Sequence, residues 1–283
     1  MIAAGLLACT ELIDIKTSDS PPVVVVYSVL TDELKYQSVM ISRSSPYFDS
    51  VPNTGISNAT VVIQSSAGEW YPFVESDSIA GLYYSKNKFR VKTGLSYSLS
   101  VEVEDKGLKE KYEAFTTVLP AVAADSLTFE SLDFFGRRNY ILYLHWQDIP
   151  EENYYLFHVL CNDSLLTAKL SDYRVSDNTL YKGQYVKGSV YRFSDFSNWE
   201  KDSPDDRKHF AYLKPGDTVA VKISLIPKGY FDFIDQCQQE QRGENPMFGG
   251  PASNIVTNIS NGGLGYFTGY CIATQSITFL GDR

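Results

Sequence analysis

Hydrophobic residues recur with the spacing of β-strands along most of the first half of the chain. Residues 23–30 (VVVVYSVL) form a continuous, mainly β-branched run, which is typical of a strand buried on both faces. Residues 36–45 alternate between apolar and polar, and residues 59–74 and 81–118 hold further short runs separated by Gly-containing turns. This short spacing predicts a β-sandwich of immunoglobulin or transthyretin type over residues 23–119.

The apolar alternation starts again after the segment LPAVAADS (residues 119–126), which predicts a hinge near Leu119. Three alternating runs between residues 126 and 164 predict a strand meander, and residues 217–227 predict another strand. We therefore expect a second β-rich domain over residues 120–283, so that the whole protein is mainly all-β with two sandwich-like domains.

Only one segment has the period of an α-helix, at residues 229–243 (GYFDFIDQCQQEQRG). Its apolar residues fall on one helical face at positions i, i+3, i+4 and i+7, and they are Tyr230, Phe233, Ile234 and Cys237. Gly243 supplies a stop signal at the end of the pattern. We expect one short helix near the C-terminus of the second domain.

A polar region over residues 173–206 is rich in aromatic side chains, which predicts a decorated hairpin or insertion. Its aromatic set consists of Tyr181, Tyr185, Tyr191, Phe193, Phe196 and Trp199. Exposed Tyr and Trp among small polar residues suit stacking and hydrogen bonding to a glycan, a peptide or another protein. The alternative is that strand alternation buries half of these rings in the sandwich.

The N-terminal residues 1–22 differ from everything that follows. Residues 1–8 are small and apolar, and LLAC at residues 6–9 fits a bacterial lipobox, in which Cys9 receives a diacylglycerol before cleavage. Two or three acyl chains would hold the protein on a bilayer, since each buried methylene contributes about 0.8 kcal/mol. An ordinary buried strand and the remnant of a secretory signal are the alternatives. The acidic, Ser- and Pro-containing sequence after Cys9 predicts a flexible tether.

Composition excludes several classes of partner and chemistry. The net charge of −9 and the pI near 4.9 argue against nucleic acid as a partner. The three later cysteines, Cys161, Cys237 and Cys271, lack CxxC spacing. We therefore expect them to be small buried thiols rather than to form a disulfide or a metal site. His145 and His158 lie in apparent strands and are expected to be packed rather than metal-binding.

Catalytic signatures are also missing from the sequence. It contains no HExxH zinc motif, no phosphate-binding P-loop and no GxSxG elbow. The glycines of GGLGYFTG (residues 262–269) do not follow the dinucleotide-binding order, and they predict a turn that leads into the last strand. We expect no cofactor, no bound metal and no catalytic residues.

The end of the chain resembles a known family. The segment NPMFGGPASNIVTNISNGGLGYFTGY, preceded by KGYFDFIDQCQQEQ, is similar to the C-terminal signature of domain of unknown function 4249, a family of Bacteroidetes outer-membrane lipoproteins. The corresponding positions are Tyr230, Asn245-Pro246, Asn258-Ile259 and residues 263–267. Resemblance extends to the lipobox and to a Tyr-rich strand that ends at Thr and Pro near residue 120. Members of the family are usually encoded beside TonB-dependent transporters.

The resemblance implies an accessory role in nutrient capture, with no catalytic residues to carry over. We therefore expect a non-catalytic lipoprotein of the outer membrane, lipid-anchored through Cys9 and facing the cell surface rather than the periplasm, whose partner is a TonB-dependent transporter. One alternative is a carbohydrate- or peptide-active enzyme with acidic residues in the second domain, for which neighbouring carboxylates in a cleft would be evidence. Another is a surface adhesin or scaffold, which predicts a flat apolar patch instead.

Overall fold

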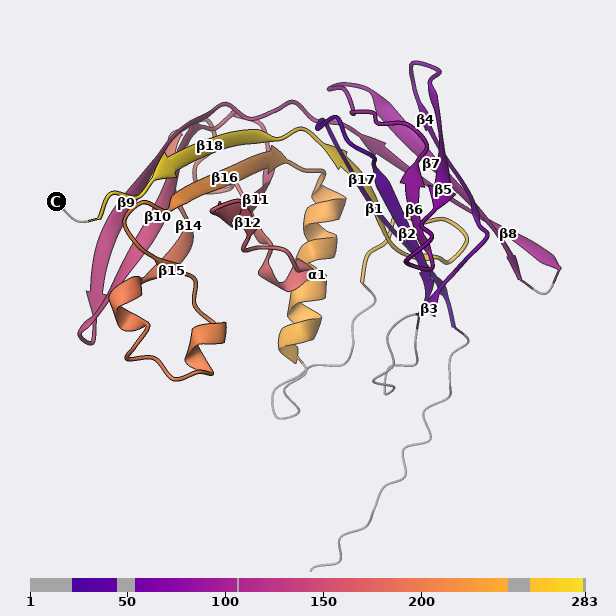
Figure 1. The fold of residues 1–283 in the computed structure, drawn as a ribbon. Helices are drawn as coiled ribbons and strands as arrows, with labels where there is room; N and C mark the ends of the chain where they lie inside the picture. Colours follow the sequence, from indigo (N-terminus) through magenta and orange to yellow (C-terminus); the bar gives the residue numbers. More distant parts are fainter. Residues whose placement is uncertain (1–21, 45–53, 106, 244–254, 282–283) are drawn as a thin grey trace, which may run out of the picture.

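Two β-rich units lie side by side with a single long helix between them (Figure 1). The computed structural model describes residues 22–44, 54–105, 107–243 and 255–281. Strands dominate both units, so the prediction of a mainly all-β protein is confirmed. Cys9 and the Asn245-Pro246 pair lie outside the described residues.

The first unit is a single curled sheet. Among the described residues it has nine strands, namely β1 (Val24–Thr31), β2 (Ser38–Arg43), β3 (Thr54–Gly55), β4 (Thr60–Ser65), β5 (Trp70–Glu75), β6 (Leu82–Ser85), β7 (Ser96–Asp105), β8 (Leu108–Thr117) and β17 (Leu264–Tyr270). Their order is β17-β1-β2-β6-β5-β4-β7-β8, and β3 pairs with β2. The two ends of this order meet, because β8 contacts β17 and Leu119 bridges Tyr270. The sheet thereby encloses its own core.

Strand β1 is covered on both faces, as its continuous apolar run predicts. Val24, Val26 and Leu30 point into the core of the first unit, where they are almost fully buried. Tyr27 and Val29 point the other way and pack in a separate cluster around the helix. Successive side chains of a strand face opposite sides, so a strand between two apolar layers needs apolar residues at every position.

The second unit consists of two facing sheets. The first sheet contains β9 (Ala124–Phe134), β10 (Arg137–Gln147), β14 (Tyr185–Asp195) and β15 (Tyr212–Leu213) in the order β15-β14-β10-β9. The second contains β11 (Tyr154–Cys161), β12 (Ser164–Leu165), β13 (Arg174–Asp177), β16 (Thr218–Leu225) and β18 (Ala273–Thr278). Trp146, Phe157 and Phe193 belong to the core between them. Short 3-10 turns are η1 (Leu170–Asp172), η2 (Phe196–Asn198) and η3 (Asp206–Lys208).

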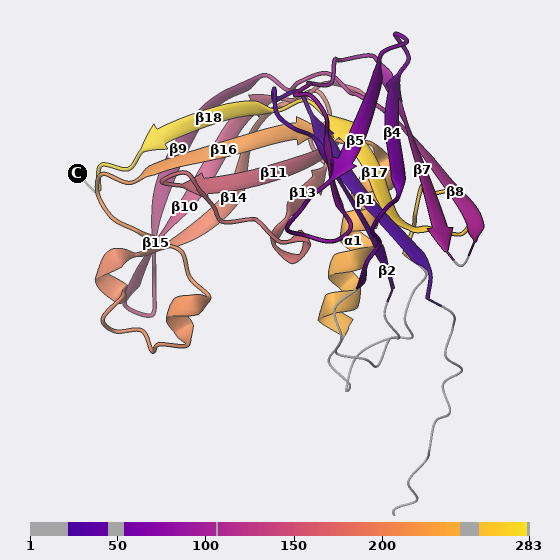
Figure 2. The same ribbon diagram turned by 45° about the vertical axis from the view of Figure 1, so that its right-hand side comes forward.

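The helix α1 (Lys228–Gly243) confirms the predicted helical segment. Tyr230 and Ile234 are fully buried and Phe233 nearly so, as their shared face predicts. They pack against Tyr266 and Tyr270 of β17 on one side and Leu156 of β11 on the other. The view in Figure 2 also places α1 between the two units. The apolar face of the helix therefore fills the junction.

The last strands of the chain tie the two units together. Strand β17 runs parallel to β1 in the first unit, and β18 then pairs with β16 in the second. Gly265 has φ +93°, and a Cβ atom there would lie 2.2 Å from the Val26 carbonyl oxygen, so only glycine allows this close approach. The turn predicted over residues 262–269 covers only residues 261–262, because β17 begins at Leu264, and β17 is not the last strand, because β18 follows it.

Two expectations for the second unit need correction. The predicted meander is only partly right, because β9 and β10 form a hairpin whereas β11 joins the opposite sheet. The region 173–206 is not an insertion, because β14 pairs with β10 as an inner strand of its sheet. Polar side chains on its outer face hide this role, since an antiparallel sheet needs only one apolar face.

Candidate functional site

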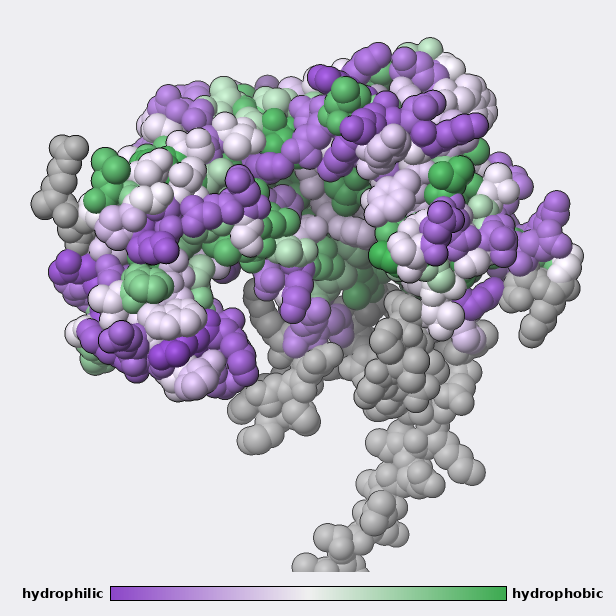
Figure 3. All heavy atoms as spheres, in the orientation of Figure 1, coloured by the Kyte–Doolittle hydropathy of each residue, from purple (hydrophilic) through white to green (hydrophobic). Residues whose placement is uncertain are grey.

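A cavity of about 350 Å³ opens where the two units meet. The first unit lines it with residues of β1, β2 and β17 and with the turn between β1 and β2. The second unit contributes residues of β11, β12 and β16, together with Tyr173, which follows η1. The space-filling view shows the surface hollowed between the units, with hydrophobic residues exposed there (Figure 3). We call this space the junction cavity.

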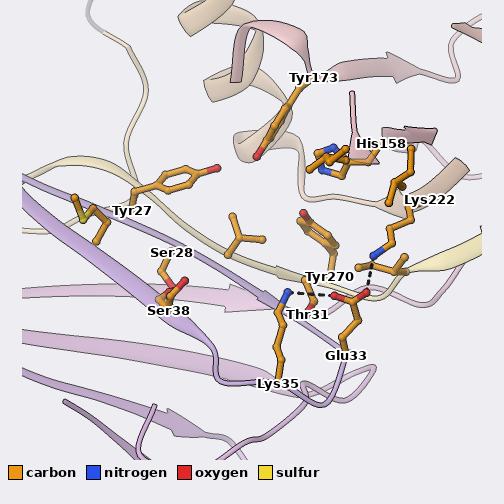
Figure 4. A pocket seen from close by; sticks show the side chains of 15 residues that line it. Tyr27, Ser28, Thr31, Glu33, Lys35, Ser38, His158, Tyr173, Lys222 and Tyr270 are labelled. Atoms are coloured by element: carbon orange, nitrogen blue, oxygen red, sulfur yellow. Dashed lines mark hydrogen bonds and ion pairs between the residues drawn. The ribbon is translucent and has the colours of Figure 1, made fainter. Parts of the chain in front are cut away.

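Tyrosines form one end of the junction cavity. The hydroxyl ends of Tyr27, Tyr173 and Tyr270 point toward its middle (Figure 4). Behind them, the hydroxyl of Tyr230 lies 2.8 Å from that of Tyr27. Burial raises the pKa of Tyr27 and of Tyr230 well above the ordinary value, and neighbouring tyrosines raise both further. These phenols therefore stay neutral and can both donate and accept hydrogen bonds.

His158 stands beside this tyrosine wall. Its ring meets that of Tyr173 edge to face, with centroids 4.6 Å apart, and its Nδ1 lies 3.1 Å from Thr167 Oγ1. Burial lowers the pKa of His158 to about 4, and the positive charge of Lys222 lowers it further, against a hydrogen bond to Thr167 that raises it. The imidazole is neutral at pH 7 and offers polarity to the cavity without charge.

An ion-pair cluster forms the other end of the junction cavity, next to Tyr270 (Figure 4). The Glu33 carboxylate lies 2.6 Å from Lys222 Nζ and 3.2 Å from Lys35 Nζ, so one acid holds two ammonium groups together (Figure 4). Burial alone would raise the pKa of Glu33, but the hydrogen bonds from Lys222 and Lys35 outweigh it and lower the pKa. This cluster therefore combines two lysine side chains with one carboxylate whose pKa is lowered.

A buried glutamine fixes the turn that carries Glu33 and Lys35. Gln37 Nε2 donates to the carbonyl oxygens of Thr31 and Phe89, each at 3.0 Å, and its Oε1 accepts from Thr31 N at 3.2 Å. A fully buried amide that satisfies backbone groups on both sides of a turn holds it rigidly. The acidic and basic groups at this end are therefore positioned before any ligand arrives.

One polar group in the wall has no protein partner. Thr31 lines the cavity and is 4% exposed, and its hydroxyl has no hydrogen-bond partner among the described residues. Burying a hydroxyl without a hydrogen bond costs about 1–3 kcal/mol, so such groups are usually satisfied by water or by a ligand. Ser28, by contrast, donates to the Ser38 carbonyl oxygen at 2.8 Å.

This arrangement suits binding. Ligand sites are typically concave, lined by aromatic and apolar groups, and supplied with a few placed polar groups. Among the described residues that line the cavity, Glu33 is the only one with a carboxylate, and its hydrogen bonds to two lysines lower its pKa. No group of His, Cys, Asp and Glu within the described part of the chain could hold a metal ion.

The structure separates the predicted aromatic set into three environments. Phe193 is fully buried in the core of the second unit, and Tyr181 and Tyr191 are half-buried against that core. Tyr185 is 57% exposed and donates to Asp125. Tyr191 also lines a polar hollow of about 570 Å³ on the second unit.

Phe196 and Trp199 remain together on the surface. Their rings stack with centroids 6.1 Å apart, Arg207 lies over Trp199, and Lys214 lies over Phe196. The hairpin between β9 and β10 is next to them, since Asn198 Nδ2 donates to the Arg138 carbonyl oxygen at 2.7 Å.

The tip of that hairpin is itself aromatic and exposed. Phe134 is 58% and Phe135 91% exposed. Phe135 also has φ +49°, which is unfavourable for a bulky residue. Together with Phe196 and Trp199 these two rings form what we call the aromatic end of the second unit. Exposed apolar groups gathered in this way are typical of contact surfaces for other proteins.

Of the described residues that line the junction cavity, the sequence drew attention only to His158, and as a packed histidine rather than a binding one. Tyr27, Tyr173 and Tyr270 come from segments far apart in the chain, and only the fold brings them together. A usable signal existed in two strands, where His158 in YYLFHVLC and Lys222 in DTVAVKISLIP interrupt apolar runs. A polar residue inside a buried strand needs a hydrogen-bond partner or a cavity, and both His158 and Lys222 line the junction cavity.

The cysteines add no chemistry to the site. Cys161, Cys237 and Cys271 are free thiols, and burial raises the pKa of each. A thiol with a raised pKa is less reactive, because the thiolate is the nucleophile.

The fold and cavity define the class of this protein as a mainly β protein of two units, with one helix and a ligand-sized space at their junction. The chain belongs to the family described as Domain of unknown function (DUF4249), whose model matches residues 10–276. The resemblance inferred from the C-terminal sequence is thus confirmed. No curated protein matches the chain. No helix in the described part of the chain combines the length and hydrophobicity needed to cross a membrane.

Proposed function

We propose that this protein is a non-catalytic binding lipoprotein of the outer membrane, accessory to a TonB-dependent transporter in nutrient capture. The observation that carries the proposal is the junction cavity, in which neutral phenols, an imidazole and an ion-pair cluster converge on a space of about 350 Å³. That volume lies at the small end of the range of ligand sites, about 300–1,000 Å³. The cavity would hold the captured compound.

The anchor and the partner have separate support. The LLAC sequence at residues 6–9 favours lipidation of Cys9, and the family resemblance favours a transporter as the partner. The aromatic end of the second unit offers a surface for that partner, because Phe134 and Phe135 are exposed and Arg137 lies two residues after Phe135. Aromatic residues and arginine are enriched where protein interfaces are tightest.

Two buried carboxylates of the second unit have structural roles. Asp148 accepts from Asn178 Nδ2 and from Gly183 N, both at 2.9 Å, and Asp217 accepts from Asn162 Nδ2 and from Lys214 N, also at 2.9 Å. Each of these acids is buried and holds a loop in place. An enzyme of the glycosidase type would instead place two carboxylates across a cleft.

The experiment is a pull-down of the full-length protein from its native outer membrane in mild detergent, followed by mass spectrometry of the protein and everything bound to it. The proposal predicts a diacylglycerol on Cys9 and a large TonB-dependent barrel in near-equal amount. A Cys9→Ala variant should lose the lipid and leave the membrane fraction. A protein recovered without lipid, or without the barrel, would overturn the proposal in favour of the enzyme or the adhesin.

A further inference from the structure

The two ends of the junction cavity differ in chemistry, and together they restrict what it can bind. One end is a wall of aromatic rings with neutral hydroxyls, formed by Tyr27, Tyr173 and Tyr270 beside His158 (Figure 4). The other end is the cluster of Glu33, Lys35 and Lys222. We propose that the cavity binds a small organic acid with one ring and a single carboxylate. This inference rests on the binding role proposed above and names the class of compound.

The charge of the ion-pair cluster sets the charge of the ligand. Among the described residues that line the cavity, two ammonium groups face one carboxylate, although the protein as a whole has a net charge of −9. Each ammonium has three N–H donors. The bonds to Glu33 use one donor on each lysine, which leaves N–H groups on both for a second carboxylate. A single negative charge completes the cluster, and a second one would be uncompensated.

Glu33 makes the cluster possible. Two like charges that share one rim repel each other, and the carboxylate between them offsets that repulsion. Lys222 comes from β16 of the second unit, whereas Lys35 comes from the turn after β1. The cluster therefore draws donors from both units toward the same point of the cavity, which a ligand carboxylate would occupy.

The tyrosine end of the cavity determines the uncharged part of the ligand. The rings of Tyr173 and His158 are held edge to face, and Tyr270 is 4% exposed, so this wall is rigid. Aromatic rings that turn their edges to a space can pack edge to face against another ring. The neutral phenols, whose hydroxyl ends point into the cavity, offer hydrogen bonds to a hydroxyl on that ring. Two sources share this chemistry, which are acidic sugars and aromatic acids.

The test compares acids with their neutral amides, using the full-length protein and titration calorimetry. The probes are glucuronate against glucuronamide and benzoate and 4-hydroxybenzoate against their amides. At least one acid should bind ten or more times as tightly as its amide, and the pair that does so identifies the source as sugar or aromatic. The affinity of the acid should fall with added salt while that of the amide should not.

Two variants localise the effect. Lys35→Met and Lys222→Met keep most of the side-chain volume and should each lower the affinity for the acid severalfold without changing that of the amide. The matched control is Lys86→Met, because Lys86 is exposed on the first unit and does not line the cavity. Circular dichroism confirms that each variant is folded.

The outcomes separate this inference from the proposed function. Amides that bind as tightly as acids, or acids whose affinity is unchanged in both lysine variants, would overturn the charge assignment while leaving a binding cavity in place. Failure of every probe to bind would overturn the ligand class, whatever the pull-down yields. Recovery of the lipidated protein without a transporter would leave the ligand class standing and remove the accessory role.

Discussion

The junction cavity and the aromatic set at residues 181–199 are two tyrosine-rich regions that differ in how their residues are spaced along the sequence and in the fold. The six residues of the aromatic set lie within 19 positions of one another in the sequence. The fold nevertheless distributes them between the core of the second unit, the margin of that core and the protein surface. The junction cavity takes residues from β1, β2, β11, β12, β16 and β17 and places them around one space. Proximity in sequence therefore says little about a site in a β protein, because neighbouring residues of a strand face opposite sides.

The largest expected effect separates two members of the aromatic set. Phe193→Ala should lower the free energy of unfolding by about 3–5 kcal/mol, because it removes a fully buried ring that packs edge to face with Phe129. Phe196→Ala is the control, and it should change that free energy by no more than about 0.5 kcal/mol, since the ring is 48% exposed. Urea denaturation measures both. Equal losses in the two variants would contradict the division of the set.

The next effect concerns the pH dependence of stability and belongs to the junction cavity. The pKa of His158 is about 4 in the folded protein, and that of an unfolded histidine is about 6.5. The unfolded chain therefore binds more protons between these values, so stability is complete above pH ~6.5 and is lost as the pH falls toward 4. The loss due to this group amounts to about 3 kcal/mol.

The measurement for His158 is denaturation at pH 7 and pH 4 for the wild type and for His158→Gln. The variant cannot gain a proton at this position, so the wild type should lose about 3 kcal/mol more stability than the variant over this range. Carboxylates contribute equally to both proteins and cancel in the difference. Identical pH profiles would show that the imidazole is not held neutral by burial.

A smaller effect tests the hydroxyl layer behind the cavity. Tyr230→Phe should cost about 1 kcal/mol of unfolding free energy, because it removes the hydroxyl bonded to Tyr27 in a buried site. Tyr185→Phe is the matched control on the aromatic set, and it should cost less than about 0.5 kcal/mol because its ring is 57% exposed. Thermal unfolding of both variants gives the comparison. A larger loss in Tyr185→Phe would reverse the assigned roles.

The smallest effect concerns Glu33. Glu33→Gln should change the free energy of unfolding by less than about 1 kcal/mol, because its ion pairs with Lys35 and Lys222 are partly exposed to solvent. Glu130→Gln, which removes a comparable exposed pair with Lys187, is the control. Denaturation at low and high salt checks both. A loss well above 1 kcal/mol would mean that the cluster holds the two units together rather than serving a ligand.

Local patterns predicted most of the fold. The β-branched run at residues 23–30, the alternating runs and the helical period at residues 229–243 each correspond to an element, because burial on one or both faces dictates these periods. The pairing of β17 with β1 escaped prediction. Nothing local records that a strand from residues 264–270 returns to the first unit, since a parallel partner can come from anywhere in the chain.

The candidate site was harder to predict from the sequence than the fold, because its residues come from segments that are far apart in the chain. Tyr27 reads as one more apolar residue of β1, and its hydroxyl partner Tyr230 lies 203 positions away. Glu33 and Lys35 have the sequence pattern of surface charges, and only the fold brings them to Lys222. Single polar residues inside apolar strands, such as His158, were the only local evidence of a cavity.

The central claim is that this protein holds its ligand in the junction cavity and not on the exposed aromatic residues. Native mass spectrometry of the protein isolated from its own membrane tests it most directly, with two aromatic truncations, Tyr173→Ala in the cavity and Trp199→Ala at the aromatic end. We predict a small-molecule adduct on the wild type and on Trp199→Ala that is lost from Tyr173→Ala. An adduct that survives in Tyr173→Ala, or a wild type that carries none, would contradict the account.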